Sequence, residues 1–346
     1  GSGYNAYTTN DETVYVLSIP SNELEKWVRL ERTRFGGLVL RLFHTELETV
    51  YEEFNKNQDN DFFWVINDVN KKLYSGHPYG EKTTIGRPED LKNPSMKAIM
   101  GFYNQYYVAN NMAMILSGDF DYDKTIKIIS ENWSDFRQNK NLTFKEYTAK
   151  DFNKIAVDEV YGKQTEFVAI AYRFNGEIDQ VESVKLGLLT EVLQNDKAGL
   201  FDINISQKQK LLSVDKVLMS NKDYTTLMLV GVPRQGQSLE DAKNTILTEI
   251  DNLKKGNFNN ELVESIMNNV KLGREVARDN NAYLVERFRN IFINGKTIDS
   301  MITAENQFDS LTKEDVVKFA NEKFKDNYVV VYKKSCENNL KETVYK

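Results

Sequence analysis

Two stretches of this chain follow the same plan, and this repeat constrains the fold more than any other feature of the sequence. Residues 18–27 (SIPSNELEKW) and 231–242 (GVPRQGQSLEDA) both run from a strand end through a proline and a polar turn to a serine that can cap a helix. Residues 102–110 and 319–327 share aromatic and asparagine positions ahead of a predicted strand. Both comparisons have an offset of about 215 residues, so one supersecondary arrangement occurs twice.

The repeat predicts an α+β fold with two structurally similar domains, each a mainly antiparallel sheet with helices packed on one face. Residues 137–153 are polar, rich in lysine and asparagine, and lack a clear period, which indicates a linker. We therefore expect a first domain over residues 1–136 and a second, homologous domain over residues 154–346. A length of 346 residues is sufficient for two domains that each bury a core.

The repeat also indicates a part of the first domain that has no counterpart here. The second copy opens with strand, helix, helix and strand between about residues 155 and 219, whereas residue 1 already corresponds to about residue 214. We expect roughly 60 residues of the first domain to lie upstream of this chain, so that this domain is truncated at its N-terminus. The alternative is that the first domain is simply smaller.

Apolar periodicity and turn residues predict the individual elements. The expected strands are 13–19, 111–116, 166–174, 212–219, 225–232 and 328–332, and the expected helices are 23–34, 38–67 (with one possible break), 94–107, 122–136, 184–194, 199–210, 238–255, 260–294 and 312–324. In the long helix, Leu47, Val50, Tyr51 and Phe54 form an apolar stripe that should face the core.

Charge and apolar content narrow the classes of partner. The net charge of −6 argues against nucleic acid or an anionic membrane surface as the main partner. No apolar run is long enough to cross a bilayer, so we expect a soluble protein without a membrane span, and both cytoplasm and periplasm remain open. The single cysteine, Cys336, cannot form an internal disulfide and is expected to be an ordinary free thiol.

The candidate chemistry is concentrated in the segment FHTELETVYEEFN, residues 43–55. Glu46 and Glu53 are seven residues apart, which places them on one helix face within about 20° of each other. A metal site is one interpretation, and a solvated helix face is the other. The two histidines, His44 and His77, do not form a helical ligand pair, and we expect His77 to make a hydrogen bond that fixes its turn. His44 and Glu48 could contact each other across one helical turn.

Four segments, in this order and spacing, resemble the insulinase/pitrilysin family of zinc peptidases, which use the inverted motif H-x-x-E-H. They are NAYTTNDETVYVLSIPSNELEKW, FHTELETVYEEFN, HPYGEKTTIGRPEDLKNPS and FYNQYYVANNMAMILSGDFD. The resemblance extends over the whole chain, including the second repeat. It implies a zinc-dependent endopeptidase, or a fragment of one, that acts on peptide substrates.

The resemblance also implies that the second domain, residues 154–346, is non-catalytic, and it implies roles for particular residues of the first domain. Glu53 matches the family's third zinc ligand, and Glu46 matches the catalytic-site glutamate that supports the histidine ligands. The segment Asn5, Ala6 and Tyr7 matches a strand that binds the substrate backbone by strand addition. In the family, the side chain that matches Tyr7 helps to form an apolar subsite, and the alternative for Tyr7 is an ordinary strand aromatic.

This chain departs from the family pattern because it contains no H-x-x-E-H segment. In the family that helix precedes the strand matching residues 5–7, so it falls in the stretch that the repeat predicts to be missing. We therefore expect the chain to bind zinc weakly and to be nearly inactive alone. The resemblance implies a partner, a second double-domain half in the same longer chain or another subunit. Two alternatives remain: a non-catalytic family subunit beside an active partner, and an unrelated α+β binding protein.

Overall fold

The structure is a computed structural model that describes residues 3–335. The chain folds into two compact units, each assembled from separate stretches of sequence. Unit 1 contains residues 1–55, 84–146 and 277–293, and unit 2 contains residues 56–83, 147–276 and 294–346. Helices and a mainly antiparallel sheet confirm the predicted α+β class. The units are defined by compactness, so the division at residues 137–153 stays a prediction.

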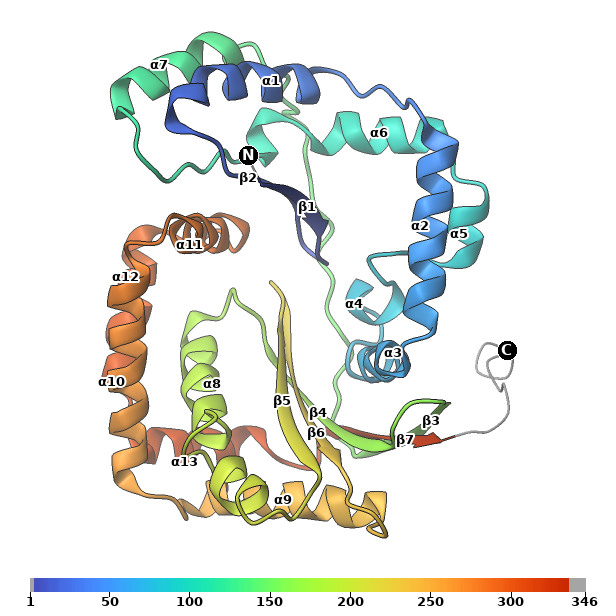
Figure 1. The fold of residues 1–346 in the computed structure, drawn as a ribbon, viewed down its shortest axis with the longest axis vertical. Coiled ribbons are helices and arrows are strands. Elements are labelled where there is room, and N and C mark those ends of the chain that lie inside the picture. Colours follow the sequence, from blue (N-terminus) through green and yellow to red (C-terminus); the bar gives the residue numbers. More distant parts are fainter. Residues whose placement is uncertain (1–2, 336–346) are drawn as a thin grey trace. The chain divides into compact units, whose positions relative to one another are not determined.

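Unit 1 is built from a two-stranded hairpin and helices (Figure 1). Its elements are β1 (Tyr4–Thr8), β2 (Thr13–Leu17), the short turn η1 (Ser21–Glu23), α1 (Leu24–Gly36), most of α2 (Phe43–Gln58), α5 (Pro88–Lys92), α6 (Met96–Tyr106), η2 (Ala109–Asn111), α7 (Tyr122–Trp133) and α11 (Asn281–Ile293). Its core is aromatic: the ring of Phe35 lies 5.1 Å from Tyr15 and 6.1 Å from Tyr107. The hydroxyl of Tyr103 donates to the carbonyl oxygen of Phe35 at 3.1 Å and so joins α6 to α1.

Unit 2 is organised around a five-stranded sheet with the order β3-β7-β4-β6-β5. The strands are β3 (Ala156–Gly162), β4 (Phe167–Asn175), β5 (Ser213–Ser220), β6 (Tyr224–Val232) and β7 (Tyr328–Ser335). The pairs β4–β6, β4–β7 and β5–β6 are antiparallel, whereas the edge strand β3 is parallel to β7. The central strand β4 is buried over nearly its whole length, as expected for a strand covered on both faces.

Most helices of unit 2 cover one face of this sheet and form the larger core. They are α8 (Gln180–Leu193), the π-helical turn η3 (Asp202–Ser206), α9 (Leu239–Lys255), α10 (Asn260–Ala277), α12 (Ile298–Asp309) and α13 (Lys313–Lys323). Ile170 of β4, Leu229 of β6 and Val330 of β7 point into this core. They alternate with residues that face the other side, because successive side chains of a strand lie on opposite faces.

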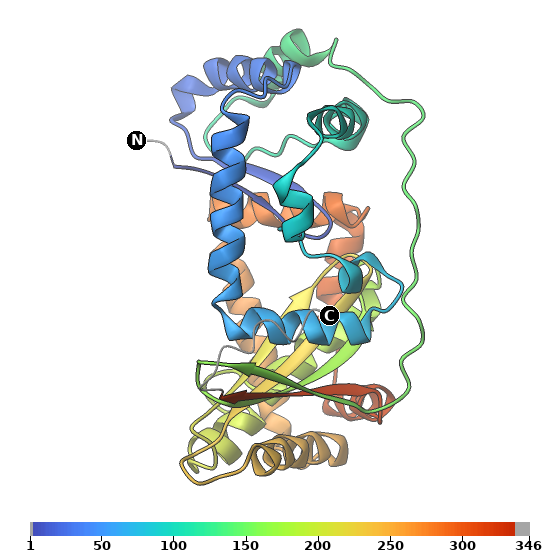
Figure 2. The ribbon, with the colours of Figure 1, turned by 90° about the vertical axis from the view of Figure 1, so that its right-hand side faces the viewer.

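The opposite face is covered by a helix from early in the sequence, α3 (Asp61–Leu73), which is followed by the short α4 (Pro78–Glu81). Figure 2 shows α3 running along the sheet on the side away from α9. Val65, Val69 and Leu73 are fully buried there. Burying aliphatic side chains of this size stabilises the folded state by about 1.5–3 kcal/mol each. The stability of the five-stranded sheet in unit 2 therefore depends on α3, a helix that precedes the predicted linker.

An ion pair inside unit 2 fixes the start of α3 to the sheet. The Nζ of Lys333, on β7, lies 3.0 Å from Oδ2 of Asp61, and both side chains are buried. The same carboxylate accepts from the backbone N–H of Gln164 at 2.7 Å, and Lys333 also donates to the Gln164 carbonyl. Gly162 is required at this point, because a Cβ there would collide with the Asp61 carboxylate. A buried charge pair of this kind is stable only when both partners are present.

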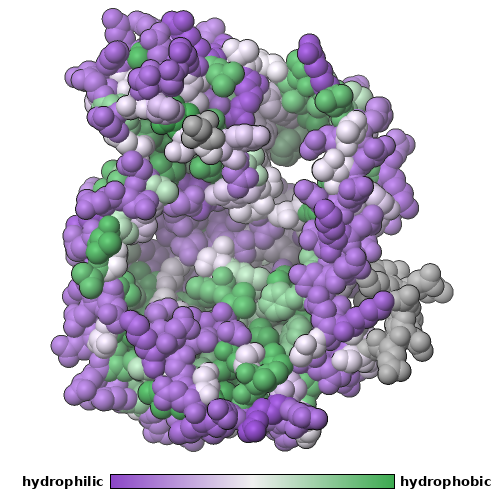
Figure 3. All heavy atoms as spheres, in the orientation of Figure 1, coloured by the Kyte–Doolittle hydropathy of each residue, from purple (hydrophilic) through white to green (hydrophobic). Residues whose placement is uncertain are grey.

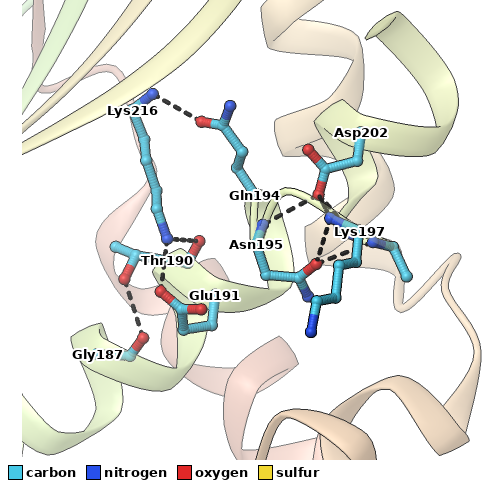
Figure 4. Close-up of polar contacts among 10 residues, drawn as sticks. Gly187, Thr190, Glu191, Gln194, Asn195, Lys197, Asp202 and Lys216 are labelled. Carbon is cyan, nitrogen blue, oxygen red and sulfur yellow. Dashed lines mark hydrogen bonds and ion pairs between the residues drawn. The ribbon is translucent and has the colours of Figure 1, made fainter. Parts of the chain in front are cut away.

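The outer edge of β5 is partly covered by a side chain from the end of α8 (Figure 4). The amide of Gln194 donates to the carbonyl of Val214 at 3.1 Å and accepts from the backbone N–H of Lys216 at 2.8 Å. The Lys216 ammonium returns to α8 and donates to the carbonyl oxygen of Thr190 at 2.9 Å. Gln194 thus occupies backbone groups that an edge strand would otherwise leave open to another chain.

The two hairpins have the same pairing register. Tyr4 pairs with Leu17 across β1 and β2, and Lys216 pairs with Leu229 across β5 and β6. Lys216 lies 212 positions after Tyr4, and Leu229 lies 212 positions after Leu17. The two hairpins therefore repeat with an offset close to the one expected from the sequence. This agreement is what a duplicated supersecondary unit would produce.

Several predicted elements need correction. Residues 112–117 form no strand, so the expected strand 111–116 is wrong, and unit 1 contains only the β1–β2 pair within the described residues. The expected helix 260–294 is two helices, α10 and α11, separated at residues 278–280. Helix α12 was not predicted. The break in helix 38–67 is confirmed between Gln58 and Asp61, where Asn60 accepts from the N–H of Phe62 and caps α3.

The remaining two expectations concern Cys336 and membrane-spanning helices. Cys336 lies outside the described residues. None of the helices between residues 3 and 335 combines the length and the apolar composition that crossing a lipid bilayer requires.

Candidate functional site: an edge strand and a pair of glutamates

The predicted substrate-binding residues Asn5, Ala6 and Tyr7 are consecutive on β1. In the described sheet, β1 has one partner, β2, and its other edge carries no strand. The backbone N–H of Ser18 donates to the carbonyl oxygen of Gly3, and that of Thr9 donates to the carbonyl oxygen of Glu12. The backbone N–H and C=O groups of the odd-numbered residues of β1 therefore point toward β2. The backbone groups of Ala6 therefore point to the free edge.

The free edge of β1 is already partly occupied by its own side chain. The Oδ1 of Asn5 accepts from the N–H of Ala6 at 2.9 Å. Asn5 and Ala6 are exposed, whereas Tyr7 is partly buried. A strand that paired with this edge would have to displace the Asn5 side chain from the Ala6 amide, and the exchange would replace one hydrogen bond with another.

Glu46 and Glu53 lie on α2, and the structure places both on its exposed side. Their Cα positions are about 10 Å apart along the helix axis, since each residue adds about 1.5 Å. The predicted apolar stripe, of which Phe54 is buried, lies beside them, about 100° around the helix. Figure 3 shows the surface along α2 as mainly hydrophilic. Within residues 3–335, neither carboxylate forms a hydrogen bond or ion pair, so both are available to an external ligand.

The described residues do not make a complete metal site. Within residues 3–335, no group of three or more His, Cys, Asp and Glu side chains is arranged to hold a metal ion. His44 is exposed and packs its ring against Phe43 at 5.6 Å, and it forms no bond to Glu48. The donor set around Glu53 therefore does not fit a zinc site that this part of the chain could build alone.

His77 is committed to a structural role, as the sequence predicted. It is almost fully buried, and its Nδ1 accepts from the N–H of Tyr79 at 3.2 Å, which caps α4. Its Nε2 lies 3.2 Å from Oδ2 of Asp223 on the turn before β6. Since Nδ1 accepts from an N–H, the proton of the neutral ring is on Nε2, which donates to Asp223.

Helix α11 supplies side chains to the β1–β2 hairpin that the sequence did not reveal. The Tyr7 hydroxyl donates to Oε1 of Glu286 over a long distance of 3.4 Å. Arg289 forms an ion pair with Glu12 in the turn between the strands, and its Nη2 lies 2.7 Å from Oε2 of Glu286. Burial is the main reason that the pKa of Tyr7 lies above its ordinary value, and neighbouring Arg289 opposes this rise. These partners are about 280 positions apart in the sequence, so no local pattern could have indicated them.

The structure therefore brings the predicted residues together in two groups within unit 1. Asn5, Ala6 and Tyr7 share one strand, and Glu46 and Glu53 share one helix face. Among the described residues, no hydrogen bond, ion pair or ring contact joins the two groups.

Comparisons with known proteins agree on one family. The family described as "Peptidase M16 inactive domain" matches residues 95–270, about half of the chain. The zinc protease PqqE of Helicobacter pylori is 25% identical in an alignment of 341 positions, which covers 94% of this chain and 74% of that protein. The chain spans between 13% and 35% of seven further curated relatives, most of them described as zinc proteases.

Solved structures show the same fold. The crystal structure of a protease from Helicobacter pylori matches with a TM-score of 0.87 and 21% identity, over 96% of this chain and 82% of that one. The first half of the periplasmic protease PqqL from Escherichia coli matches with a TM-score of 0.78 and 17% identity, over 95% of this chain and 75% of that one. At these identities the solved structures show only that the fold is shared. The family itself is shown by the match over residues 95–270. This chain belongs to the M16 peptidase family.

Proposed function

We propose that this chain supplies a peptide-binding strand and one metal-ligand carboxylate to an M16 zinc endopeptidase. The observation that supports this most directly is the combination within unit 1 of a strand with a free edge and a helix face with two unpaired carboxylates. The zinc proteases among the curated relatives support the reaction class, hydrolysis of peptide bonds.

The proposed role of β1 is to hold an extended peptide by main-chain pairing. The outward N–H and C=O groups of Ala6 would bond to the backbone of the peptide, which makes binding tolerant of its sequence. Tyr7 would provide an aromatic wall for one side chain of the peptide. Its partly buried ring offers a large apolar surface at a small cost in side-chain entropy.

Glu53 is the proposed zinc ligand, and Glu46 is proposed to orient histidine ligands through hydrogen bonds. Those histidines would be carried by a segment that is not among the 346 residues, because His77 is buried in a structural role and His44 has no second histidine near it in the sequence. We assign no catalytic step to this chain, since its described residues do not complete a metal site. A second double-domain half, in the same longer polypeptide or in another subunit, is the proposed partner.

Two measurements on the chain of 346 residues test this proposal. Zinc content after dialysis should be far below one ion per chain, and a quenched fluorescent peptide should be cleaved very slowly. Tight stoichiometric zinc together with rapid cleavage would contradict the assignment of the histidines to another segment.

A binding measurement tests the role of β1 separately. The anisotropy of a fluorescein-labelled extended peptide should saturate when the chain is added, and Tyr7→Ala should weaken binding by about tenfold, the loss expected when an aromatic wall is removed. Tyr122→Ala is the matched control, since Tyr122 is an exposed tyrosine of α7 in the same unit. Equal affinity for the wild type and Tyr7→Ala would remove Tyr7 from the site.

A non-catalytic subunit beside an active partner is the second candidate, and the family description "inactive domain" favours it. The two candidates differ at Glu53. In a catalytic assembly, Glu53→Gln lowers the zinc content and activity of the complex that contains the histidine segment. In a non-catalytic subunit, the same substitution leaves both unchanged.

A further inference from the structure

Helix α11 contacts the β1–β2 hairpin at its strand and at its turn, although it lies far along the sequence. Figure 1 shows α11 beside this hairpin, and both belong to unit 1. Glu286 accepts from the Tyr7 hydroxyl on β1, and Arg289 pairs with Glu12 at the turn. A further contact holds α11 to another part of unit 1: the Ser117 hydroxyl, outside the hairpin, donates to Oδ1 of Asn281 at the start of α11, at 2.9 Å.

The pair between Arg289 and Glu12 is well placed to restrain the hairpin. The side chain of Glu12 is 13% exposed and that of Arg289 is 23% exposed, so solvent screens this pair less than a surface pair. Arg289 also donates through Nε to Oε2 of Glu286 at 2.8 Å, which leaves Oε1 directed at Tyr7. One guanidinium therefore links the turn of the hairpin to the carboxylate that holds Tyr7.

A two-stranded hairpin is marginally stable by itself and needs packing or polar anchors from elsewhere. The β1–β2 pair has no third strand among the described residues. If β1 binds an extended peptide, the entropy lost on binding is smaller when the strand is already held in place. Contacts that fix β1 without touching the peptide would therefore increase its affinity.

We infer that Arg289 and Glu286 are positioning residues for the peptide-binding strand, Arg289 through Glu12 and Glu286 through Tyr7. This inference rests on the proposed function of β1 and extends it to the second half of the sequence. The second half then has an active part in peptide binding, because it supplies the helix that orders the strand.

A charge exchange in the full chain tests the role of Arg289. Arg289→Glu should raise the Kd of the fluorescein-labelled peptide by about fivefold and should speed amide exchange across residues 4–17. Adding Glu12→Arg to Arg289→Glu restores a pair of opposite charges, and we expect the affinity to return to within about twofold of the wild type. Lys243→Glu is the control, since it reverses one partner of an ion pair on α9 in unit 2.

A double-mutant cycle tests the role of Glu286. Glu286→Gln should weaken peptide binding in the wild type and should have a smaller effect when Tyr7→Phe has already removed the hydroxyl, because only the contact of Glu286 with Arg289 is then lost. Independent effects of the two substitutions would overturn the proposed path through Tyr7.

Peptide affinity and amide exchange together distinguish a failure of the inference from a failure of the proposed function. Peptide binding that is unchanged by Arg289→Glu overturns the inference and leaves the function of β1 intact. If the wild-type chain binds no peptide, the proposed function fails, and amide exchange still decides whether α11 orders β1. Exchange that is equally slow in the wild type and in Arg289→Glu would then overturn the positioning role as well.

Discussion

Glu53 and Glu46 are distinguished from the other acidic residues of α2 by their proposed roles and not by their exposure. Glu52 is also exposed and lies on the same helix, one position before Glu53 and therefore about 100° around it. A carboxylate that binds zinc contributes a negative charge that an amide cannot replace, whereas a carboxylate on a solvated face can be neutralised at little cost.

The first prediction concerns these three glutamates in the proposed assembly of this chain with a segment that carries H-x-x-E-H. Glu53→Gln should largely abolish zinc retention, Glu46→Gln should lower zinc affinity by about 10–100-fold, and Glu52→Gln should leave it unchanged. Competition with a chromophoric chelator measures all three. If all three variants bound zinc as tightly as the wild type, Glu46 and Glu53 would be only part of a solvated helix face.

A second residue-scale prediction concerns Asp61 and Lys333. Asp61→Leu leaves the buried ammonium of Lys333 without its counter-charge, and we expect the free energy of unfolding to fall by about 3–5 kcal/mol. The double variant Asp61→Leu/Lys333→Met removes both charges and should lose much less. Urea denaturation followed by circular dichroism gives both values.

The neighbouring residue provides the control for this pair. Lys334 is next to Lys333 on β7, but its ion pair with Glu159 is at the surface. Lys334→Ala should therefore change the free energy of unfolding by about 0.5 kcal/mol or less. A loss for Asp61→Leu as small as that for Lys334→Ala would show that the buried pair does not anchor α3.

At the scale of elements, capping side chains determine where several helices begin. The Thr312 side chain accepts from the N–H of Asp315, and the Asp315 carboxylate accepts from the N–H and the hydroxyl of Thr312. These hydrogen bonds from the Thr312 backbone and side chain lower the pKa of Asp315 below its ordinary value of 3.8. The same box recurs at Ser238 and Asp241 at the start of α9.

The lowered pKa gives the third prediction a defined pH dependence. A carboxyl group whose pKa is lower in the folded state contributes stability that is present above its unfolded pKa and is lost as the pH falls through the folded value. Asp315→Asn should therefore lower the free energy of unfolding by about 1 kcal/mol at pH 6, and its difference from the wild type should narrow below about pH 3.8. Urea titrations at pH 6 and pH 3 measure the two differences.

Glu314 is the control for the cap, since it lies in the same first turn and is exposed. Glu314→Gln removes only an interaction with the helix dipole, and we expect a loss of about 0.5 kcal/mol or less. A pH-independent loss in Asp315→Asn would mean that the amide disturbs the turn by another route.

At the scale of the whole molecule, the compact units do not follow the order of the sequence. Helix α3, which precedes the predicted linker, covers a face of the sheet in unit 2, and α11, which follows the linker, belongs to unit 1. Each half of the sequence thus contributes a helix to a unit that is otherwise built mainly from the other half. Two halves that share helices in this way are expected to unfold together.

The fourth prediction follows from this exchange of helices. A fragment of residues 154–346 lacks α3 and exposes the sheet face that Val65, Val69 and Leu73 cover in the full chain. We expect this fragment to bind a hydrophobic dye and to melt at a lower temperature than the full chain. Melting at the temperature of the full chain would show that the second half folds independently.

A substitution in the full chain tests the same surface without truncation. Val69→Asp buries an unpaired charge under the sheet and should lower the free energy of unfolding by several kcal/mol. Val39→Asp is its control, because Val39 is 69% exposed. Similar stabilities of the two variants would contradict the role of α3 as a cover for the sheet.

The sequence by itself determined the local and periodic features of this protein. The α+β class, the repeat at an offset of about 215 residues, the break in the helix 38–67 and the turn-fixing role of His77 depend on spacing and on residues close in the chain. The resemblance of four ordered segments to the insulinase/pitrilysin family agrees with the M16 match and with the insulin-degrading enzymes among the curated relatives. The proposed roles of Glu46, Glu53 and residues 5–7 still rest on this resemblance. The missed strand 111–116 shows the limit of this reasoning, because an apolar run becomes a strand only when another strand offers its backbone groups.

Only the tertiary structure decided which distant residues meet. The pairing of Asp61 with Lys333, of Tyr7 with Glu286 and of Glu12 with Arg289 joins side chains more than 270 positions apart. No periodic pattern records such a contact, because it depends on how whole helices and sheets pack against each other. The cover of the second sheet by α3 and the support of β1 by α11 therefore became visible only when the chain was folded.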